Sequence, residues 1–405
     1  MTRKQNSKST VARKIAELGV IILLAGLAAI GLRLATENSN VPSATSIQKN
    51  QSIQPPSLSL QQCIDNWPVS FLVGQVLAVG IPADSMTVQA PIFKHYRVGS
   101  AVLSTSPTNP NDGSIKRFKK AGGGPHDPVL ISTDEEGGDV QRFSSLGVLP
   151  APAEVASSLT PAQAKTLITN HGVKLKSVGI DMVLGPLADV APQQTASPLG
   201  SRVFSSNPAI VTSYVGDYIQ GWQAAGLLPT LKHFPGMGSA TGNTDFEPAT
   251  TPPLSSLKTR DFVPYTNLAI TGTAVMVGNQ NVPGWFKGPA SLSLTVNQYL
   301  RNTLGYKNNF IVTDSLAATA ITSVDTVPEA VVKALAAGND MALIVEPSGF
   351  DVTKASTTKL ISQVEAVIVK AVNNGLISKQ QLATSVDRKL SAQHINACSL
   401  TKADY

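Results

Sequence analysis

The chain has 405 residues, of which 42% are hydrophobic, with 31 glycines and 27 prolines; this composition is typical of globular proteins and excludes fibrous or wholly disordered ones. Its net charge of +6 is uneven, because residues 1–62 contain seven of the 32 basic and two of the 26 acidic residues, which leaves 25 basic and 24 acidic residues in the remainder. That near-neutral remainder argues against a nucleic-acid partner.

The N-terminal segment is basic and then apolar. Five basic residues precede the uncharged run 18–32, and Arg33 follows it. The run is shorter than the about 20 residues of a spanning helix, but a long arginine side chain can reach the interface and let the helix continue to residue 35. A cleaved signal peptide and a retained anchor both fit. We favour a membrane anchor over residues 1–35, because Arg33 stands where a cleavage site needs small neutral residues. Either interpretation places the rest of the chain outside the cytoplasm, anchored or secreted.

Residues 36–61 are rich in Ser, Gln, Asn and Pro, which is typical of a flexible linker. The two cysteines of the chain, Cys63 and Cys398, bracket most of the remaining sequence. In an oxidising compartment they would pair, and a loop this long would gain upwards of about 4 kcal/mol in the chain-entropy model. Two unpaired thiols are the alternative. We favour the disulfide, because export and the terminal positions of the cysteines agree.

Short continuous apolar runs recur after Cys63, as is typical of parallel strands buried on both faces. The eight runs are residues 76–81, 100–103, 128–131, 182–184, 227–231, 274–277, 310–312 and 341–345. Helical patterns at 161–178, 208–222 and 327–338 lie between them, and two more helices close the chain. These elements predict an α/β fold, a single (β/α)8 TIM-type barrel domain over residues 62–400. An open doubly wound sheet is the alternative; the count of eight and the absence of a G-x-G-x-x-G motif after the first run disfavour it.

Polar side chains follow most of these runs, where the strands are expected to end. They include Asp134, Glu135, Glu136, Asp189, Lys232, His233, Asn279, Asp314 and Glu346. In a barrel of this kind the carboxyl ends of the strands meet at one face, so we expect a pocket lined by carboxylates. A helix cap would explain one such carboxylate, but not carboxylates after four runs. The pocket suits a neutral polyhydroxy ligand, and a carboxylate can attack an anomeric carbon. No metal-ligand spacing is present, so we expect no metal.

Three motifs resemble glycoside hydrolase family 3, and most closely its single-domain bacterial β-N-acetylhexosaminidases. The motifs are Asp134-Glu135-Glu136-Gly137-Gly138 followed by Val140-Gln141-Arg142, Lys232-His233-Phe234-Pro235-Gly236, and residues 310–314 ending in Thr313-Asp314. The resemblance runs from about Cys63 to about Leu390. It implies that Asp314 is the nucleophile that forms a covalent glycosyl-enzyme. It also implies a set of residues that hold the non-reducing sugar: Asp134, Arg142, Arg202, Lys232 and His233.

The loop after the Lys-His pair departs from the family pattern. Relatives read Gly-His-Gly and then Asp-Ser-His, and that Asp-His pair is their general acid/base. Here the loop reads Gly236-Met237-Gly238 and then Asn243-Thr244-Asp245. Asp245 is our first candidate for the acid/base, because burial can raise the pKa of a carboxyl group. Glu247 is the second candidate, and loss of acid assistance is the third alternative.

The resemblance as a whole implies a retaining exo-glycoside hydrolase that releases terminal β-linked N-acetylglucosamine, with cell-wall fragments as its natural source. Carbohydrate and the membrane would be its partners, and we expect a monomer without metal or organic cofactor. A β-glucosidase or xylosidase is one alternative. A sugar-binding relative with impaired catalysis is the other, because the Asp-His pair is replaced.

Overall fold

The computed structural model describes residues 60–192, 196–346 and 353–405, which all belong to a compact unit, Ser57–Tyr405. The expected membrane segment, residues 1–35, and almost all of the expected linker, residues 36–61, lie outside the described residues. Within the described ranges, no helix combines the length and the apolar character that a membrane crossing requires.

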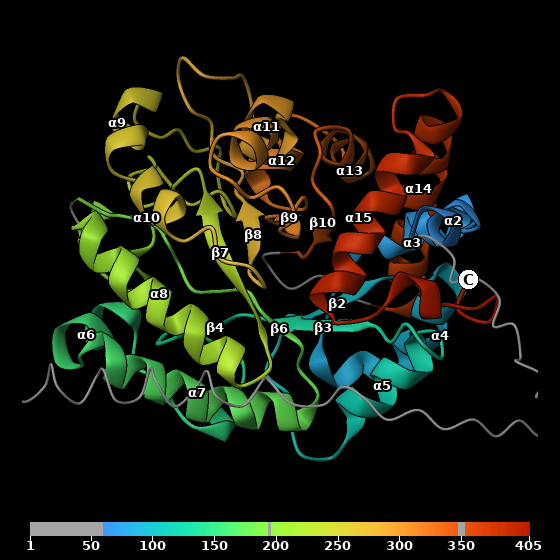
Figure 1. Cartoon of the computed structure of the whole chain (residues 1–405), viewed down its shortest axis with the longest axis horizontal. Helices are drawn as coiled ribbons and strands as arrows, with labels where there is room; N and C mark the ends of the chain where they lie inside the picture. Colours follow the sequence, from blue (N-terminus) through green and yellow to red (C-terminus); the bar gives the residue numbers. More distant parts are fainter. Residues whose placement is uncertain (1–59, 193–195, 347–352) are drawn as a thin grey trace, which may run out of the picture. The chain divides into compact units, whose positions relative to one another are not determined.

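Eight parallel strands form a nearly closed barrel, so the predicted eight-stranded architecture is confirmed (Figure 1). The strands are β1 Leu77–Ile81, β2 Ser100–Leu103, β3 Leu130–Thr133, β6 Met182–Val183, β7 Leu228–Phe234, β8 Ala274–Val277, β9 Ile311–Thr313 and β10 Ala342–Ile344. Their order in the sheet is β10-β1-β2-β3-β6-β7-β8-β9. A parallel bridge between Val312 and Met341 joins β9 to the residue before β10, which brings the two edges of the sheet together.

Helices connect the strands and cover the outside of the barrel (Figure 1). They are α2 Leu60–Asp65, α3 Val69–Gln75, α4 Met86–Tyr96, α5 Ser114–Gly122, α6 Pro152–Ser158, α7 Pro161–Val178, α8 Pro208–Ala224, α9 Leu254–Thr259, α10 Phe262–Asn267, α11 Leu294–Asn302, α12 Thr319–Thr322, α13 Val327–Ala336, α14 Lys354–Asn373 and α15 Lys379–Ala392. Thr160 and Thr326 start α7 and α13 with capping boxes, each followed by a proline at the first helical positions. These caps satisfy amide groups that a helix start leaves without partners, which fixes where both helices begin.

The core explains why the strands read as continuous apolar runs. Ala78, Val102 and Leu130 belong to a cluster inside the barrel, whereas the neighbours Leu77 and Ala101 pack in the larger cluster between strands and helices. Successive side chains of a strand point to opposite faces. Since both faces are buried here, both are mostly apolar, and no regular alternation appears in the sequence.

Two local features were not predicted. A short antiparallel hairpin, β4 Glu135–Gly137 with β5 Val140–Gln141, follows β3 directly. It turns at Gly137 and Gly138, whose φ angles of 98° and 59° are in the range that favours glycine. In addition, β7 extends to Phe234, three residues beyond the predicted run, so the Lys-His pair lies within the strand.

The ends of the described domain are joined covalently. A disulfide links Cys63 in α2 to Cys398 in the short 3₁₀ helix η6 Ala397–Ser399, which is the pairing we favoured from the sequence. The ring of Tyr405 also packs against Phe71, with 5.6 Å between the ring centroids. The first and last helices are therefore held side by side on the outside of the barrel.

Candidate active site

A cavity of about 350 Å³ opens among the residues that follow the barrel strands. Its wall includes every catalytic and sugar-binding residue predicted from the sequence: Asp134, Arg142, Arg202, Lys232, His233, Asp245 and Asp314. These residues come from positions as far apart as 134 and 314 in the chain. The topology brings them together because the carboxyl ends of parallel strands meet at one face of the barrel.

A buried carboxylate, that of Glu136, organises the cations of the site. Lys232 Nζ lies 2.5 Å from Glu136 Oε1, while Arg202 binds the same carboxylate in a bidentate manner through Nε at 2.7 Å and Nη2 at 2.9 Å. Burial opposes ionisation of Glu136, but Lys232 and Arg202 outweigh it and lower its pKa to about 2. Lys232 Nζ also contacts Asp134 Oδ1 at 2.9 Å. Glu136 is thus an interior counter-ion that fixes where Lys232 and Arg202 enter the cavity.

Replacing Glu136 by glutamine is expected to lower the free energy of unfolding by about 3–5 kcal/mol at pH 7, since buried Lys232 and half-buried Arg202 lose the counter-ion that they share. The pKa of Glu136 falls from 4.5 to about 2 on folding, so its stabilisation is complete above pH 4.5 and is lost as the pH falls towards 2. That acid-sensitive contribution, about 3 kcal/mol, should be absent from the variant. Urea unfolding over a pH series measures both effects.

Glu154→Gln is the control, because Glu154 is exposed in the first turn of α6. Its loss should cost less than about 1 kcal/mol. Equal destabilisation by the two changes would contradict the role given to Glu136.

His233 is held by a second buried carboxylate, Asp189. The His233 Nδ1 atom lies 2.8 Å from Asp189 Oδ2, and the other oxygen, Oδ1, accepts a 2.6 Å hydrogen bond from the backbone N–H of Met237. Because Nδ1 is used in this contact, the ring can turn only its Nε2 edge to a ligand. Asp189 therefore joins β7 to the start of the loop that follows it.

Asp314 lies immediately after β9 and is half-buried in the cavity wall. Its backbone N–H donates to the carbonyl of Val277 at 2.7 Å, which continues the pairing of β8 with β9 by one more residue. The carboxylate Oδ1 accepts a 2.8 Å hydrogen bond from the N–H of Ser315. The backbone on both sides of Asp314 is thus fixed, and the carboxylate has a defined position at the bottom of the cavity wall.

The loop after β7 is anchored at Met237, which stands at the position of the histidine in the Gly-His-Gly pattern. Met237 is buried in a small apolar cluster, and the hydroxyl of Thr244 donates to its sulfur at 3.5 Å. A side chain at the next residue, Gly238, would place its Cβ 2.3 Å from the carbonyl of Val190, so only glycine allows this approach. The glycine-rich composition thus reflects close packing of the loop.

Asp245 is positioned by its own loop and by α12. Its backbone N–H donates to Asn243 Oδ1 at 3.0 Å, and its carbonyl accepts from Thr319 N at 3.1 Å. The carbonyl of Thr244 accepts from Ala320 N, also at 3.1 Å. Since α12 begins five residues after Asp314, these bonds hold the loop against the segment that carries the other carboxylate.

The cavity raises the pKa of Asp245 to about 6. Burial is the main cause, and the nearby carboxylate of Asp314 adds to it, while His233 and Arg202 act in the opposite direction. With such a pKa the carboxyl group is protonated in about half of the molecules at pH 6 and in about one tenth at pH 7. It can therefore donate a proton, which an ordinary aspartate cannot do.

Of the remaining predicted site residues, Arg142 lines the cavity and Glu247 does not. The buried Nε of Arg142 has no hydrogen-bond partner within the described residues. Glu247, the second acid/base candidate, is exposed and is not among the cavity-lining residues. The described residues contain no group of three or more histidine, cysteine or acidic side chains arranged to hold a metal ion.

The roles of Glu136 and Asp189 were not predicted from the sequence, although both residues follow predicted strands. The sequence does mark both residues, since each is a carboxylate that follows a buried apolar run. Nothing in the sequence distinguished an interior counter-ion from a ligand-binding carboxylate, because that depends on which cations the fold places beside it.

Comparisons with known proteins agree with this geometry. Residues 71–392 match the family described as "Glycosyl hydrolase family 3 N terminal domain". The "Beta-hexosaminidase LpqI" of Mycobacterium tuberculosis is 38% identical over 282 residues, which are 67% of this chain and 72% of that protein. A "Beta-hexosaminidase" of Stenotrophomonas maltophilia is 32% identical over 234 residues, 55% of this chain and 69% of the relative. A solved structure of M. tuberculosis LpqI has 34% identity and a TM-score of 0.73, and the match covers 82% of this chain and 95% of that one.

Proposed function

The chain belongs to glycoside hydrolase family 3, and we propose that it is a retaining exo-hydrolase that releases terminal β-linked N-acetylglucosamine. The names of the relatives at 38% and 32% identity, both β-hexosaminidases, support this substrate class. The main structural support for this proposal is that Asp314, Asp245 and the Lys232–Asp134 pair line the same cavity.

The sugar is held on one side of the cavity. Asp134 and Lys232, bound to each other through the 2.9 Å contact, offer an acceptor and a donor that can fork onto neighbouring hydroxyl groups. Arg142 and Arg202 add donors, and His233 presents its free ring edge. With the cations fixed by Glu136, the donors keep their positions when the sugar enters, so less entropy is lost on binding.

Hydrolysis proceeds in two displacements. In the first, an Asp314 oxygen forms a bond to the anomeric carbon as the bond to the leaving oxygen breaks, and protonated Asp245 gives its proton to that oxygen. In the second, ionised Asp245 takes a proton from water, whose oxygen displaces Asp314 from the anomeric carbon. Asp314 leaves as a carboxylate and Asp245 is protonated again, so the enzyme returns to its starting state with β configuration in the product.

An assay of the full chain with aryl β-N-acetylglucosaminide and aryl β-glucoside tests the substrate class. We expect turnover of the first substrate and at least about tenfold lower kcat/KM for the second, which lacks the acetamido group. The reverse preference would indicate a β-glucosidase-like enzyme. The replacement of the family's Asp-His pair by Asn243 and Asp245 favours a different alternative, a sugar-binding protein, and that interpretation requires sugar binding without turnover of either substrate.

The proposed location is extracytoplasmic, with residues 1–35 as a membrane anchor. The basic head, the apolar run 18–32 and the Cys63–Cys398 disulfide support this location, since disulfides persist in oxidising compartments. Fractionation of the producing cells, with detection of the chain before and after alkaline washing of the membranes, tests the anchor. Release of the chain into the medium at the mass of a cleaved form would instead indicate a signal peptide.

A further inference from the structure

A second hollow, of about 760 Å³, lies at the opposite end of the barrel from the candidate active site. Residues just before three strands help to line it: Arg97 precedes β2, Pro128 precedes β3 and Asp181 precedes β6. The candidate active site instead follows the carboxyl ends of the strands. A ligand in the second hollow would therefore leave the entrance to the active site free.

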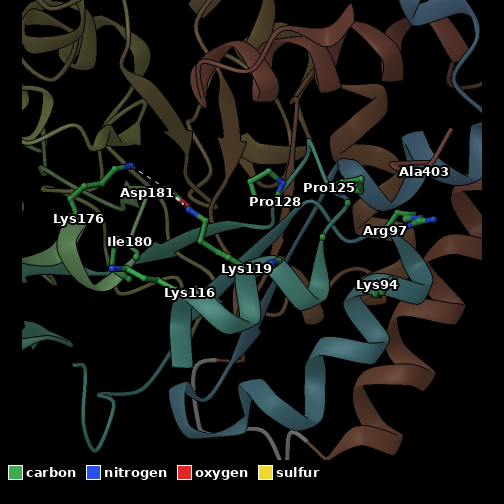
Figure 2. Close-up of a pocket in the computed structure, with 14 residues that line it drawn as sticks. Lys94, Arg97, Lys116, Lys119, Pro125, Pro128, Lys176, Ile180, Asp181 and Ala403 are labelled. Carbon is green, nitrogen blue, oxygen red and sulfur yellow. Dashed lines mark hydrogen bonds and ion pairs between the residues drawn. The ribbon is translucent and has the colours of Figure 1, made fainter. Parts of the chain in front are cut away.

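The lining of this second hollow is strongly cationic (Figure 2). Six basic side chains line it and only one acidic side chain: Lys94, Arg97, Lys116, Lys119, Lys120, Lys176 and the acidic Asp181. We call this set the basic hollow. The net charge of the basic hollow is +5, whereas the net charge of residues 63–405 as a whole is only +1. The cations are concentrated at this place and are not a property of the whole surface.

Only part of this charge is compensated locally. Asp181 Oδ1 is shared by Lys119 at 2.7 Å and Lys176 at 3.2 Å, and Figure 2 shows both amino groups turned towards it. Another nearby carboxylate, Asp404, is buried and is bound by His126. Within the described residues, no carboxylate makes an ion pair with Lys94, Arg97, Lys116 or Lys120. Four cations thus remain available to an external anion.

The helix ends alone do not account for these cations. Basic residues are favourable in the last turn of any helix, where the dipole is negative, and Lys94, Lys120 and Lys176 are in such positions. Arg301 and Lys389 occupy equivalent positions in α11 and α15 and are each paired with an aspartate, whereas Lys258 and Lys370 end α9 and α14 without an ion pair to a described carboxylate. The basic hollow differs in that several such unpaired cations, from more than one helix, line a single cavity.

The shape of the basic hollow suits a compact anion. Gly123, Gly124 and Pro125 form part of its wall, so little side-chain volume fills the space between the lysines. Lysine ammonium groups are point charges that bind phosphate oxygens without demanding one fixed orientation. We propose that the basic hollow binds a phosphate-bearing anion, supplied either by a soluble phosphate compound or by a phospholipid headgroup.

The test compares two double charge reversals in the full chain. Lys116→Glu/Lys120→Glu changes the basic hollow, and both side chains are exposed on α5. Lys258→Glu/Lys287→Glu is the matched control, because these exposed lysines follow β7 and β8 at the other end of the barrel and line neither cavity. Hydrolysis of an aryl glycoside should be unchanged in both variants, which shows that both are folded.

Binding is measured with inorganic pyrophosphate by calorimetry, and with phosphatidylglycerol and phosphatidylcholine vesicles by co-sedimentation. We expect the Lys116/Lys120 variant to bind at least about tenfold more weakly than the control, and the difference to shrink at high salt. An effect on pyrophosphate supports a soluble phosphate compound, and an effect on phosphatidylglycerol vesicles alone supports a headgroup. The proposal is overturned if neither probe binds, or if the two variants bind equally. A failure here leaves the proposed hydrolase untouched, since the two sites share no residue.

Discussion

Replacing Asp314 by alanine is expected to lower kcat for an aryl β-N-acetylglucosaminide by at least about 10⁴-fold, because the group that forms the covalent intermediate is removed. The change should leave folding intact, since the carboxylate is only half-buried and the hydrogen bonds of its backbone N–H are independent of the side chain. Steady-state kinetics measure the loss, and the unfolding transition in urea measures stability.

Asp139→Ala provides a matched control, because this exposed aspartate is close in sequence to Asp134 and does not line the cavity. It should keep wild-type activity. Azide added to the Asp314→Ala variant can take the place of the missing nucleophile, and the glycosyl azide so formed should have α configuration, since only one inversion occurs. Near-normal turnover by Asp314→Ala, or a product of β configuration with azide, would show that the nucleophile is another group.

The eight strands of the barrel could be predicted because each one leaves its own pattern in the sequence. A strand buried on both faces is apolar at most positions, so eight continuous runs were visible without any knowledge of pairing. The hairpin at Gly137-Gly138 was not foreseen, since three-residue strands leave almost no pattern and two adjacent glycines indicate a turn of any kind.

The sequence was sufficient to predict which residues form the site, but not which role each of them has. Family motifs and strand ends identified Lys232, Asp134 and Asp314, which do lie in one cavity. That Glu136 is an interior counter-ion could not be foreseen, because it depends on Arg202, 66 residues away, reaching the same carboxylate. Tertiary partners, and not the residue type, decide whether a carboxylate serves structure or ligand.

The conformation of the loop with Asp245 also depends on tertiary contacts that its composition does not reveal. Its glycine, serine and threonine residues are typical of a flexible loop, but the structure anchors it through buried Met237 and through hydrogen bonds to α12. An anchored loop can hold a carboxylate in the cavity beside Asp314, where burial and the second negative charge raise its pKa. We therefore propose that the carboxyl group of Asp245, with its raised pKa, does the work of the family's Asp-His pair.

Replacing Asp245 by asparagine should lower kcat/KM by about 10²–10⁴-fold for substrates with a sugar leaving group. The loss should be much smaller for a dinitrophenyl glycoside, whose leaving group needs no proton. For the wild-type enzyme, kcat/KM on the sugar substrate should fall as the pH rises above about 6, because the raised pKa of Asp245 makes its protonated form the minority there. The pH profile of the variant should lack this decline.

Glu247→Gln is the control for Asp245→Asn, because Glu247 is the other acidic residue of the loop. Glu247 is exposed and lies outside the cavity, so its replacement should change neither the rate nor the pH profile. Asp245 and Asp314 line the same cavity, so loss of either carboxylate is expected to slow hydrolysis. The leaving-group dependence separates the two residues: loss of a nucleophile slows every substrate, whereas loss of an acid slows only those that need a proton. Equal slowing of both substrates by Asp245→Asn would therefore exclude Asp245 as the acid, and would leave it a role in placing the sugar.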